Sequence, residues 1–373
     1  MRRRVSSTVL RGKEYGDISP FTRQVLFNTN CLEIKVSEDQ LKVIAQTQDN
    51  QKLILIPTLL VGGDGLNSIV RKTLHETEEK SNSFVMQMFP SPSSGLKYKV
   101  LTLPPQFPLS EEKNDLTKST MAYAIRSFFK EKKKAISLGL LPFKNPNQPR
   151  TANIITYPNH QIWQLKTSEE VKQFLKVAFP QIPLEKIVSD KEIARFTYSE
   201  GGNFPIPQFC SGVYKIWGEP DKSKGIAVIL LGDAVHCFPP DIGQGVNSAL
   251  EDVYILQEIL EKTKDNLSET LPIYQNRRQD DIKALIRLVQ ISYPWQYNQD
   301  PLQKKLWSIN FFIRLLLSRF LPFLFSPHSF VLIQNHELSY SEILAKSNRT
   351  IKILLGTVVL GVILILFFIV MYN

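Results

Sequence analysis

The stretch LLGDAVHCFPPDIGQGVNSALED, residues 230–252, decides the fold. It continues Ile226–Leu231, an apolar run bounded by glycines on both sides, which is typical of a strand buried in a parallel sheet. The spacing of apolar residues at its other end predicts a helix from about Gly245 to Lys262. The pattern therefore predicts a strand that ends in an acidic loop, followed by a Gly-x-Gly turn that opens a helix.

This loop has the residue types that contact with a bound nucleotide or flavin requires. Asp233, at the carboxyl end of the strand, is placed to accept hydrogen bonds from a ribose or ribitol hydroxyl. Gly243 and Gly245 allow close approach to the backbone, and the first N–H groups of the helix favour an anionic or electron-rich ligand edge. The alternative, a strand–turn–helix whose glycines serve packing alone, explains a lone Gly-x-Gly better than this whole string.

A second glycine loop, VGGDGLNSIVR at residues 61–71, follows a short apolar strand at Leu59–Val61. A helix is expected to begin near Asn67. Taken alone, Asp64-Gly65 indicates only a turn. Here it follows a strand, opens a helix and lies 169 residues before Asp233.

Together the two loops resemble the fingerprints GADGxxSxVR and GDAxHxxxPxxGqGxNxAxED of class A FAD-dependent aromatic monooxygenases, most closely those of the kynurenine 3-monooxygenase type. The resemblance covers most of the chain and is sharp at 59–71 and 230–252. It implies a membrane-anchored enzyme that binds FAD, takes electrons from NADPH or NADH, and hydroxylates a small aromatic substrate with O2 through a flavin C4a-hydroperoxide. It implies no catalytic side chain, because the flavin carries the chemistry.

The resemblance also assigns residues to the cofactor. Asp233 would bind the ribityl or ribose hydroxyls, and the segment from Gly243 to Asn247 would lie under the isoalloxazine ring. Asp64 and Arg71 would hold the pyrophosphate side and assist binding of the pyridine nucleotide. The full set of expected cofactor-binding residues is Arg2, Asp64, Gly65, Arg71, Gly232, Asp233, Ala234, Pro239, Pro240, Gly243, Gln244, Gly245, Val246 and Asn247.

Two aromatic residues are expected to contact the substrate. Tyr340 lies just before the last apolar run, much as a substrate-contacting tyrosine does in the family, and a packed core aromatic is the alternative. Phe238 lies within the long loop. His236 is interpreted as a structural loop histidine, because this chemistry needs no general base.

The sequence departs from the family in one respect: it contains no GxGxxG, the turn on which the ADP pyrophosphate normally rests. Three explanations compete: a truncated gene model or fragment, a separate chain that supplies the nucleotide-binding unit, or a divergent, flavin-free descendant. The third explanation leads to a second hypothesis, a non-catalytic membrane-anchored protein that serves in binding or as a scaffold.

These patterns predict an α/β protein with an incomplete FAD-binding Rossmann-like domain, an α+β substrate domain and a helical C-terminal region. Strand-like runs at Arg23–Phe27, Cys31–Val36, Leu41–Ala45 and Leu53–Ile56 predict an antiparallel hairpin or meander. The expected divisions are residues 1–80 and 216–265 for the FAD-binding domain, 81–215 for a substrate domain with a mostly antiparallel sheet, and 266–350 for the helical region.

The composition restricts the class of protein, the kinds of metal site and the types of partner. The chain has 373 residues, 43% of them hydrophobic, and a net charge of +10, which is typical of a globular protein with an anionic partner. Its three cysteines lie far apart, which argues against a disulfide framework and a zinc site, and no metal is expected. Residues 277–352 hold 11 Lys/Arg and 5 Asp/Glu without a nucleic-acid-binding motif, so a membrane is favoured over nucleic acid.

Two C-terminal segments concern that membrane. Ile353–Met371 contains no charge and is long enough for a transmembrane helix, although a buried soluble helix is the alternative. Lys346, Arg349 and Lys352 precede it, so the positive-inside tendency places the body in the cytosol; the resemblance alone suggests the mitochondrial outer membrane. Leu306–Phe325 contains Arg314, Arg319 and Pro322, and it is interpreted as an interfacial or re-entrant helix, with a core helix as the alternative.

Overall fold

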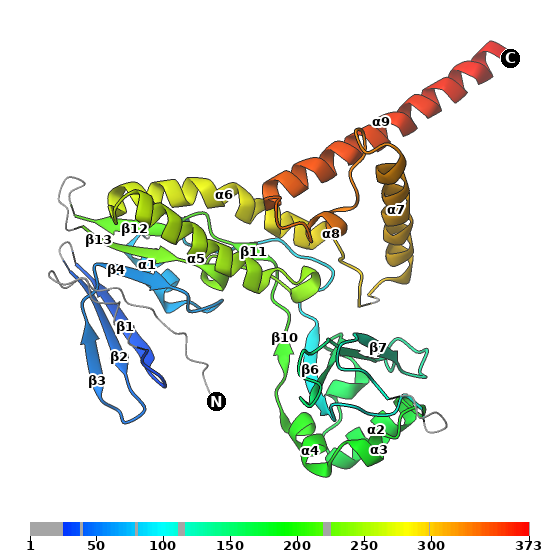
Figure 1. Cartoon of the computed structure of the whole chain (residues 1–373), viewed down its shortest axis with the longest axis horizontal. Coiled ribbons are helices and arrows are strands. Elements are labelled where there is room, and N and C mark those ends of the chain that lie inside the picture. Colours follow the sequence, from blue (N-terminus) through cyan, green and yellow to red (C-terminus); the bar gives the residue numbers. More distant parts are fainter. Residues whose placement is uncertain are drawn as a thin grey trace. The chain divides into compact units, whose positions relative to one another are not determined.

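The computed structural model describes residues 25–37, 40–78, 81–110, 116–218, 225–297 and 299–372. The chain divides into two compact units (Figure 1). The first unit combines Met1–Pro92 with Ile206–Asn373, and the second unit is Ser93–Pro205. Each unit has a hydrophobic core of its own.

The centre of the first unit is β13 (Ile226–Leu230), in which every residue is buried. It pairs in parallel with β4 (Leu59–Gly62) and antiparallel with β12 (Tyr214–Trp217). Leu230 stands opposite Gly62 in the parallel pair. Because parallel strands end at the same edge of a sheet, the two glycine loops that follow β4 and β13 emerge side by side.

A three-stranded antiparallel meander precedes β4, formed by β1 (Asn30–Val36), β2 (Leu41–Gln46) and β3 (Lys52–Leu55). The prediction of a strand at Arg23–Phe27 is wrong for the part that the structure describes. Val25 and Leu26 are not in a strand, and Phe27 and Asn28 form a turn in which Asn28 has a φ of 51°. This left-handed conformation, which asparagine tolerates well, ends the extended backbone there.

Helices dominate the rest of the first unit, and the helical C-terminal region is confirmed. Besides α1 (Ile69–Thr77), which follows β4, they are α5 (Gly245–Lys262), α6 (Leu267–Ile291), α7 (Pro301–Phe320), α8 (Ser329–Leu332) and α9 (Tyr340–Tyr372). The bounds of α5 agree with the sequence prediction. A small sheet of β5 (Gln87–Met88), β11 (Gln208–Phe209) and β14 (His236–Cys237) completes the unit. The protein therefore has a mixed α/β fold.

The apolar end of α9 projects away from the rest of the first unit (Figure 1). Helix α9 is long and apolar enough to cross a membrane, and its most apolar part has no buried residues. The length and composition of this helix are those that a bilayer-spanning helix needs.

The second unit is an antiparallel sheet covered by helices. Its strand order is β10-β6-β9-β8-β7. The strands are β6 (Lys97–Leu103), β7 (Tyr123–Arg126), β8 (Ser137–Leu140), β9 (Arg150–Thr156) and β10 (Gly202–Asn203), and the helices are α2 (Ser168–Ala178), α3 (Leu184–Ile187) and α4 (Asp190–Tyr198). Helix α2 begins with a capping box between Thr167 and Glu170.

Close packing between β4, β13 and α1 depends on a missing side chain at Gly62. A Cβ built there would lie 2.8 Å from Val70 Cβ and 2.9 Å from a methyl group of Leu230. Neither the strand nor the helix can yield easily, because both lie in the core. Gly62 therefore sets how closely α1 approaches the parallel pair.

We expect Gly62→Ala to destabilise the first unit by about 1–3 kcal/mol, because the added methyl group overpacks the core. Gly63→Ala is the matched control, since a Cβ at Gly63 has nothing within 4 Å and the residue has no positive φ. Urea unfolding of both variants measures the difference. Equal unfolding midpoints would show that the contact between β4 and α1 is loosely packed.

Candidate functional site

The loops after β4 and β13 are joined by Arg71. Its Nη1 donates a hydrogen bond to the carbonyl of Ala234 at 2.8 Å, and its Nη2 donates to the carbonyl of Leu66 at 2.6 Å. Arg71 therefore binds the turn just before its own helix and the loop after β13 at once. The two sequence motifs, which lie far apart in the chain, form one structural site.

The N-terminus of α1 is capped by side chains of the loop after β4. The Asp64 carboxylate accepts hydrogen bonds from the Ser68 hydroxyl at 2.6 Å and from the backbone N–H of Ile69 at 2.6 Å. The Ser68 hydroxyl in turn accepts from the N–H of Arg71. Asp64 thus neutralises the positive end of this helix. Its predicted contact with a cofactor pyrophosphate stays a prediction.

The loop after β13 presents Asp233 to solvent at the end of the strand. A 3-10 turn, Gly232–Ala234, carries this residue. Asp233 is exposed, whereas Gly232 and Ala234 on either side are buried. The surrounding loop partly desolvates the Asp233 carboxyl and raises its pKa above the ordinary value. The arrangement leaves one carboxyl group available to a ligand.

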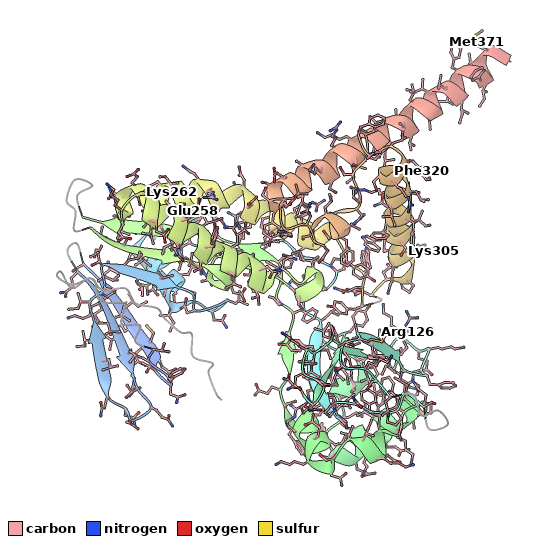
Figure 2. All side chains as sticks on the ribbon, viewed as in Figure 1. Arg126, Glu258, Lys262, Lys305, Phe320 and Met371 are labelled. Carbon is pink, nitrogen blue, oxygen red and sulfur yellow. The ribbon has the colours of Figure 1, made fainter. Side chains whose placement is uncertain are left out.

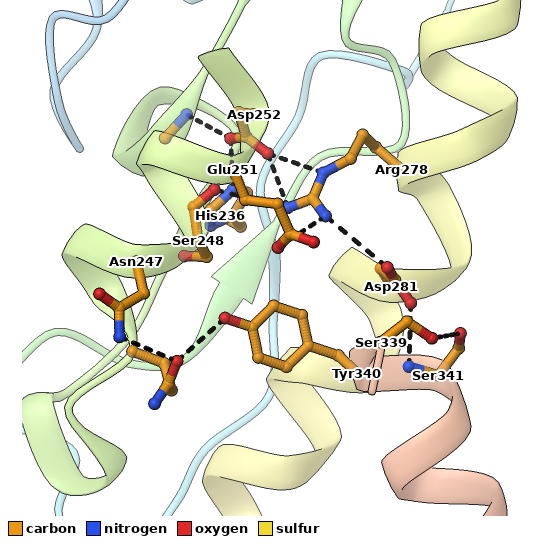
Figure 3. A network of polar contacts seen from close by, with 12 residues as sticks. His236, Asn247, Ser248, Glu251, Asp252, Arg278, Asp281, Ser339, Tyr340 and Ser341 are labelled. Atoms are coloured by element: carbon orange, nitrogen blue, oxygen red, sulfur yellow. Dashed lines mark hydrogen bonds and ion pairs between the residues drawn. The ribbon is translucent and has the colours of Figure 1, made fainter. Parts of the chain in front are cut away.

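Asp252, fully buried on α5, holds this loop in place (Figure 3). Its Oδ2 accepts a hydrogen bond from the N–H of Gly232 at 2.8 Å and lies 2.8 Å from Nε2 of His236. One carboxylate oxygen therefore contacts Gly232, just before Asp233, and His236, three residues after it. His236 is itself buried, in agreement with its interpretation as a structural histidine.

Arg278 of α6 neutralises Asp252 from the other side. Its Nε and Nη2 reach Asp252 Oδ1 at 2.8 and 2.7 Å, and its Nη1 lies 3.0 Å from Glu251. Burial alone would raise the pKa of the Asp252 carboxyl, but the charges and hydrogen bonds of His236 and Arg278 lower it below its ordinary value. Asp252 is thus held ionised, and a charged clamp inside the protein fixes the loop.

The Gly-x-Gly turn leaves room at the start of α5. Gly243 has a φ of 65°, and a Cβ at Gly243 or Gly245 would have nothing within 4 Å. The helix that begins here has no side-chain cap on its first N–H groups. This combination leaves both space and hydrogen-bond donors for an electron-rich ligand edge.

Helix α9 contacts this turn through its first residues. The Tyr340 hydroxyl donates to Gln244 Oε1 at 3.1 Å, and Asn247 Nδ2 donates to the same oxygen at 3.3 Å. The N–H of Ser341 donates to Asp281 Oδ1 at 2.9 Å, and Asp281 lies near Arg278 (Figure 3). Tyr340 is buried, and burial raises the pKa of its hydroxyl. The sequence-predicted substrate residue is therefore a neighbour of the predicted flavin turn.

The other predicted residues are distributed unevenly around the site. Phe238 and Pro239 are buried, whereas Pro240 is exposed. Val246 is also exposed, and Gly65 occupies an open turn with a φ of 81°. Arg2 lies outside the described residues.

Sequence reasoning missed the two charged residues of α6. Arg278 and Asp281 lie on the helix face that carries the buried residues Tyr274, Ile282 and Leu285. Charged residues at helical spacing on an apolar face are the signal that could have found them, because such residues are rarely buried unless paired. Asp252, the partner of Arg278, lies within residues 230–252, but the sequence assigned no role to it.

Comparison with known proteins also points to FAD binding. Residues 221–289 match the family described as FAD binding domain. The chain is 27% identical over 195 residues to kynurenine 3-monooxygenase of Phaeosphaeria nodorum, covering 52% of this chain and 38% of that protein. It is 29% identical over 202 residues to kynurenine 3-monooxygenase of Saccharomyces cerevisiae, covering 52% and 40%. The chain is related to the kynurenine 3-monooxygenases.

This relationship confirms the resemblance to FAD-dependent aromatic monooxygenases that the two loops indicate. The match spans less than half the length of these curated relatives. Among solved structures, OxyS anhydrotetracycline hydroxylase from Streptomyces rimosus is 17% identical, with a TM-score of 0.47, over 76% of this chain and 48% of that chain.

We expect Arg278→Met to destabilise the first unit by about 3–5 kcal/mol, because it leaves Asp252 buried without its cation. Arg277→Gln is the matched control, since Arg277 forms an exposed ion pair with Glu258. Its loss should cost at most about 1 kcal/mol. Urea unfolding measures both variants, and equal effects would mean that Arg278 contributes no more than a surface charge.

Proposed function

We propose that this chain holds the flavin of a membrane-anchored monooxygenase of the kynurenine 3-monooxygenase type. The proposed reaction uses NADPH or NADH and O2 to hydroxylate a small aromatic substrate. The observation that carries the proposal is the exposed carboxyl of Asp233, held by the buried contacts of Asp252 beside the open Gly243–Gly245 turn. The relationship to FAD-dependent enzymes supports it.

The residues present fit FAD. Asp233 offers an acceptor to ribityl or ribose hydroxyls, with Gly232 and Ala234 as its backbone neighbours. The open turn at Gly243 leaves space where a side chain would block a flat ring. The uncapped start of α5 supplies N–H groups and a partial positive charge, which favour negative charge on a reduced flavin.

When bound, FAD would supply the oxygen-transfer chemistry, and the chain's own residues position it. Asp233 orients the sugar chain, and the turn from Gly243 to Asn247 supports the ring. Arg71 holds the two loops at a constant separation through Leu66 and Ala234. Pro239 and Pro240 form a rigid part of the loop, and Phe238 and Tyr340 are the proposed aromatic contacts of the substrate.

The nucleotide-binding unit remains a proposal in two forms. A segment with the missing GxGxxG either precedes these residues in a longer chain or belongs to a separate chain. Translation of the DNA upstream of Met1 distinguishes the two, because an in-frame strand–GxGxxG–helix pattern there supports the first form.

We further propose that α9 crosses a bilayer, with the body on the cytosolic side. The helix is long and apolar enough, and the cations Lys346, Arg349 and Lys352 lie at its entrance. Cations collect on the cytosolic side of a span, which sets the orientation. The mitochondrial outer membrane is the proposed location, and it rests on the resemblance alone.

We expect the purified full chain to bind FAD, and Asp233→Ala to weaken this binding by about tenfold to hundredfold. The reason is that a hydrogen bond to a charged group contributes about 1.5–3 kcal/mol. Titration followed by flavin fluorescence measures the dissociation constant. Asp49→Ala, at an exposed turn, is the control and should bind like the unchanged chain.

A chain that binds no flavin would contradict this proposal for these residues alone. It would favour the non-catalytic binding or scaffold protein instead. Restoration of binding by an added nucleotide-binding unit would support the form in which that unit is separate.

We expect removal of all residues after Thr350 to release much of the protein from membranes, because it deletes the apolar part of α9. Sedimentation of membranes, followed by carbonate extraction, measures the released fraction. A chain lacking only Tyr372 and Asn373 is the control. If the shorter chain remained fully membrane-bound, the segment Leu306–Phe325 would be the main anchor.

A further inference from the structure

Helix α7 carries an exposed apolar stripe. Its members recur at intervals of three and four residues, so they share one side of the helix. We call them the α7 stripe: Leu302, Leu306, Ile309, Ile313, Leu316 and Phe320, all more than a third exposed. The other side of the helix packs inward, where Trp307 contacts the rings of Tyr293 and Phe330. The stripe therefore has no partner within the described residues.

The end of α7 is attached to α9 just before its apolar run. Arg314 of α7, which is buried, donates to the Ser347 hydroxyl at 3.3 Å. In the turn that follows, the N–H of Ser326 donates to the Thr350 hydroxyl at 2.9 Å. The uncharged run begins three residues after Thr350, a rise of about 4.5 Å. Figure 2 shows Phe320 at this end of α7 and Lys305 at the distant end.

The turn between these helices is also apolar and exposed. Phe323 is 69% exposed, and Leu321 and Leu324 are exposed beside it. Arg349 Nη2 donates to the carbonyl of Phe323 at 3.4 Å, so this turn lies at the level where α9 enters the proposed bilayer. The apolar surface of the span is thus continuous with that of the turn and the α7 stripe.

The charges of this region are mostly positive. From Pro301 to the end of the chain the acidic residues are Glu337 and Glu342, against seven Lys and Arg. Four cations are exposed near the attachment point, and we call them the basic collar: Arg319, Lys346, Arg349 and Lys352. The three on α9 cover about 9 Å of helix, similar to the thickness of a headgroup layer.

We propose that the basic collar and the α7 stripe form a binding surface for anionic phospholipid. The stripe and its turn contact the acyl boundary, and the collar contacts the phosphate and carboxylate of the headgroups. Two arguments favour lipid as the occupant: the surface continues the candidate span, and its charge complements an anionic leaflet. The inference rests on the proposed membrane span of α9, and it adds the lipid class and the residues that select it.

The test is lipid selectivity of the full chain in phosphatidylcholine bilayers. Trace spin-labelled phosphatidylserine or phosphatidylcholine reports, by electron spin resonance, which lipid is immobilised at the protein. We expect phosphatidylserine to be preferred by about fivefold, the effect of one basic residue at an anionic surface. The preference should fall as salt is raised, because exposed charges are screened.

The quadruple variant R319Q/K346Q/R349Q/K352Q should lose this preference. The matched control K52Q/K72Q/K130Q/K133Q removes the same charge from exposed lysines elsewhere and should retain it. Equal selectivity in both variants, or no selectivity in the unchanged chain, would overturn the proposal. Flotation of the same samples shows whether the chain is in the bilayer, so failure of the span is seen separately.

A second copy of the chain is the competing occupant of the α7 stripe. In that case bilayer discs would contain two chains, and L306S/L316S/F320S would convert them to discs with one chain. Light scattering of the discs measures this number. Two chains per disc that separate in the variant would overturn the lipid assignment of the stripe.

Discussion

The ion pair between Asp252 and Arg278 is the contact on which the candidate site depends. Both residues are fully buried, so neither charge is stable there without the other. The pair fixes α5 against α6. The other carboxylate oxygen of Asp252, Oδ2, accepts a hydrogen bond from the loop after β13. A neutral contact could join the helices equally well, but it would not hold an N–H and a histidine at once. The charge therefore serves the geometry of the loop.

From this clamp the rest of the site follows in two directions. Toward the sheet, Gly232 and His236 are held on both sides of Asp233, and Arg71 connects this loop to the loop after β4. Toward the C-terminus, Asp281 receives the N–H of Ser341, and Tyr340 reaches Gln244. The first turn of the proposed membrane helix is thus part of the same polar network as the proposed flavin loop. The proposed membrane helix and the proposed flavin loop therefore depend on the same supporting contacts.

Helices α1 and α5 show that a strand, a glycine loop and a helix in succession can give either a capped or an uncapped helix N-terminus. Both follow a parallel strand and a glycine loop, yet Asp64 and Ser68 close the start of α1, whereas α5 has no such cap. Helix N–H groups that already bind a carboxylate cannot also bind a ligand. The open turn at α5 is therefore the better position for an electron-rich ring, and α1 serves to support the sheet edge.

By itself, the sequence determined the elements that strong local signals encode. The buried run predicts β13 to within one residue, the spacing after Gly245 predicts α5, and the uncharged run predicts the apolar part of α9. In the described part of the strand expected at Arg23–Phe27, from Val25 on, the prediction fails because Asn28 turns the backbone, a local preference that the apolar pattern obscures. Only the tertiary structure decided that Arg278 pairs with Asp252 and that Asp281 binds the start of α9. It also decided that Arg71 joins the two motifs. Their partners lie distant in sequence, and pairing between distant charges leaves no periodic signal in a single chain.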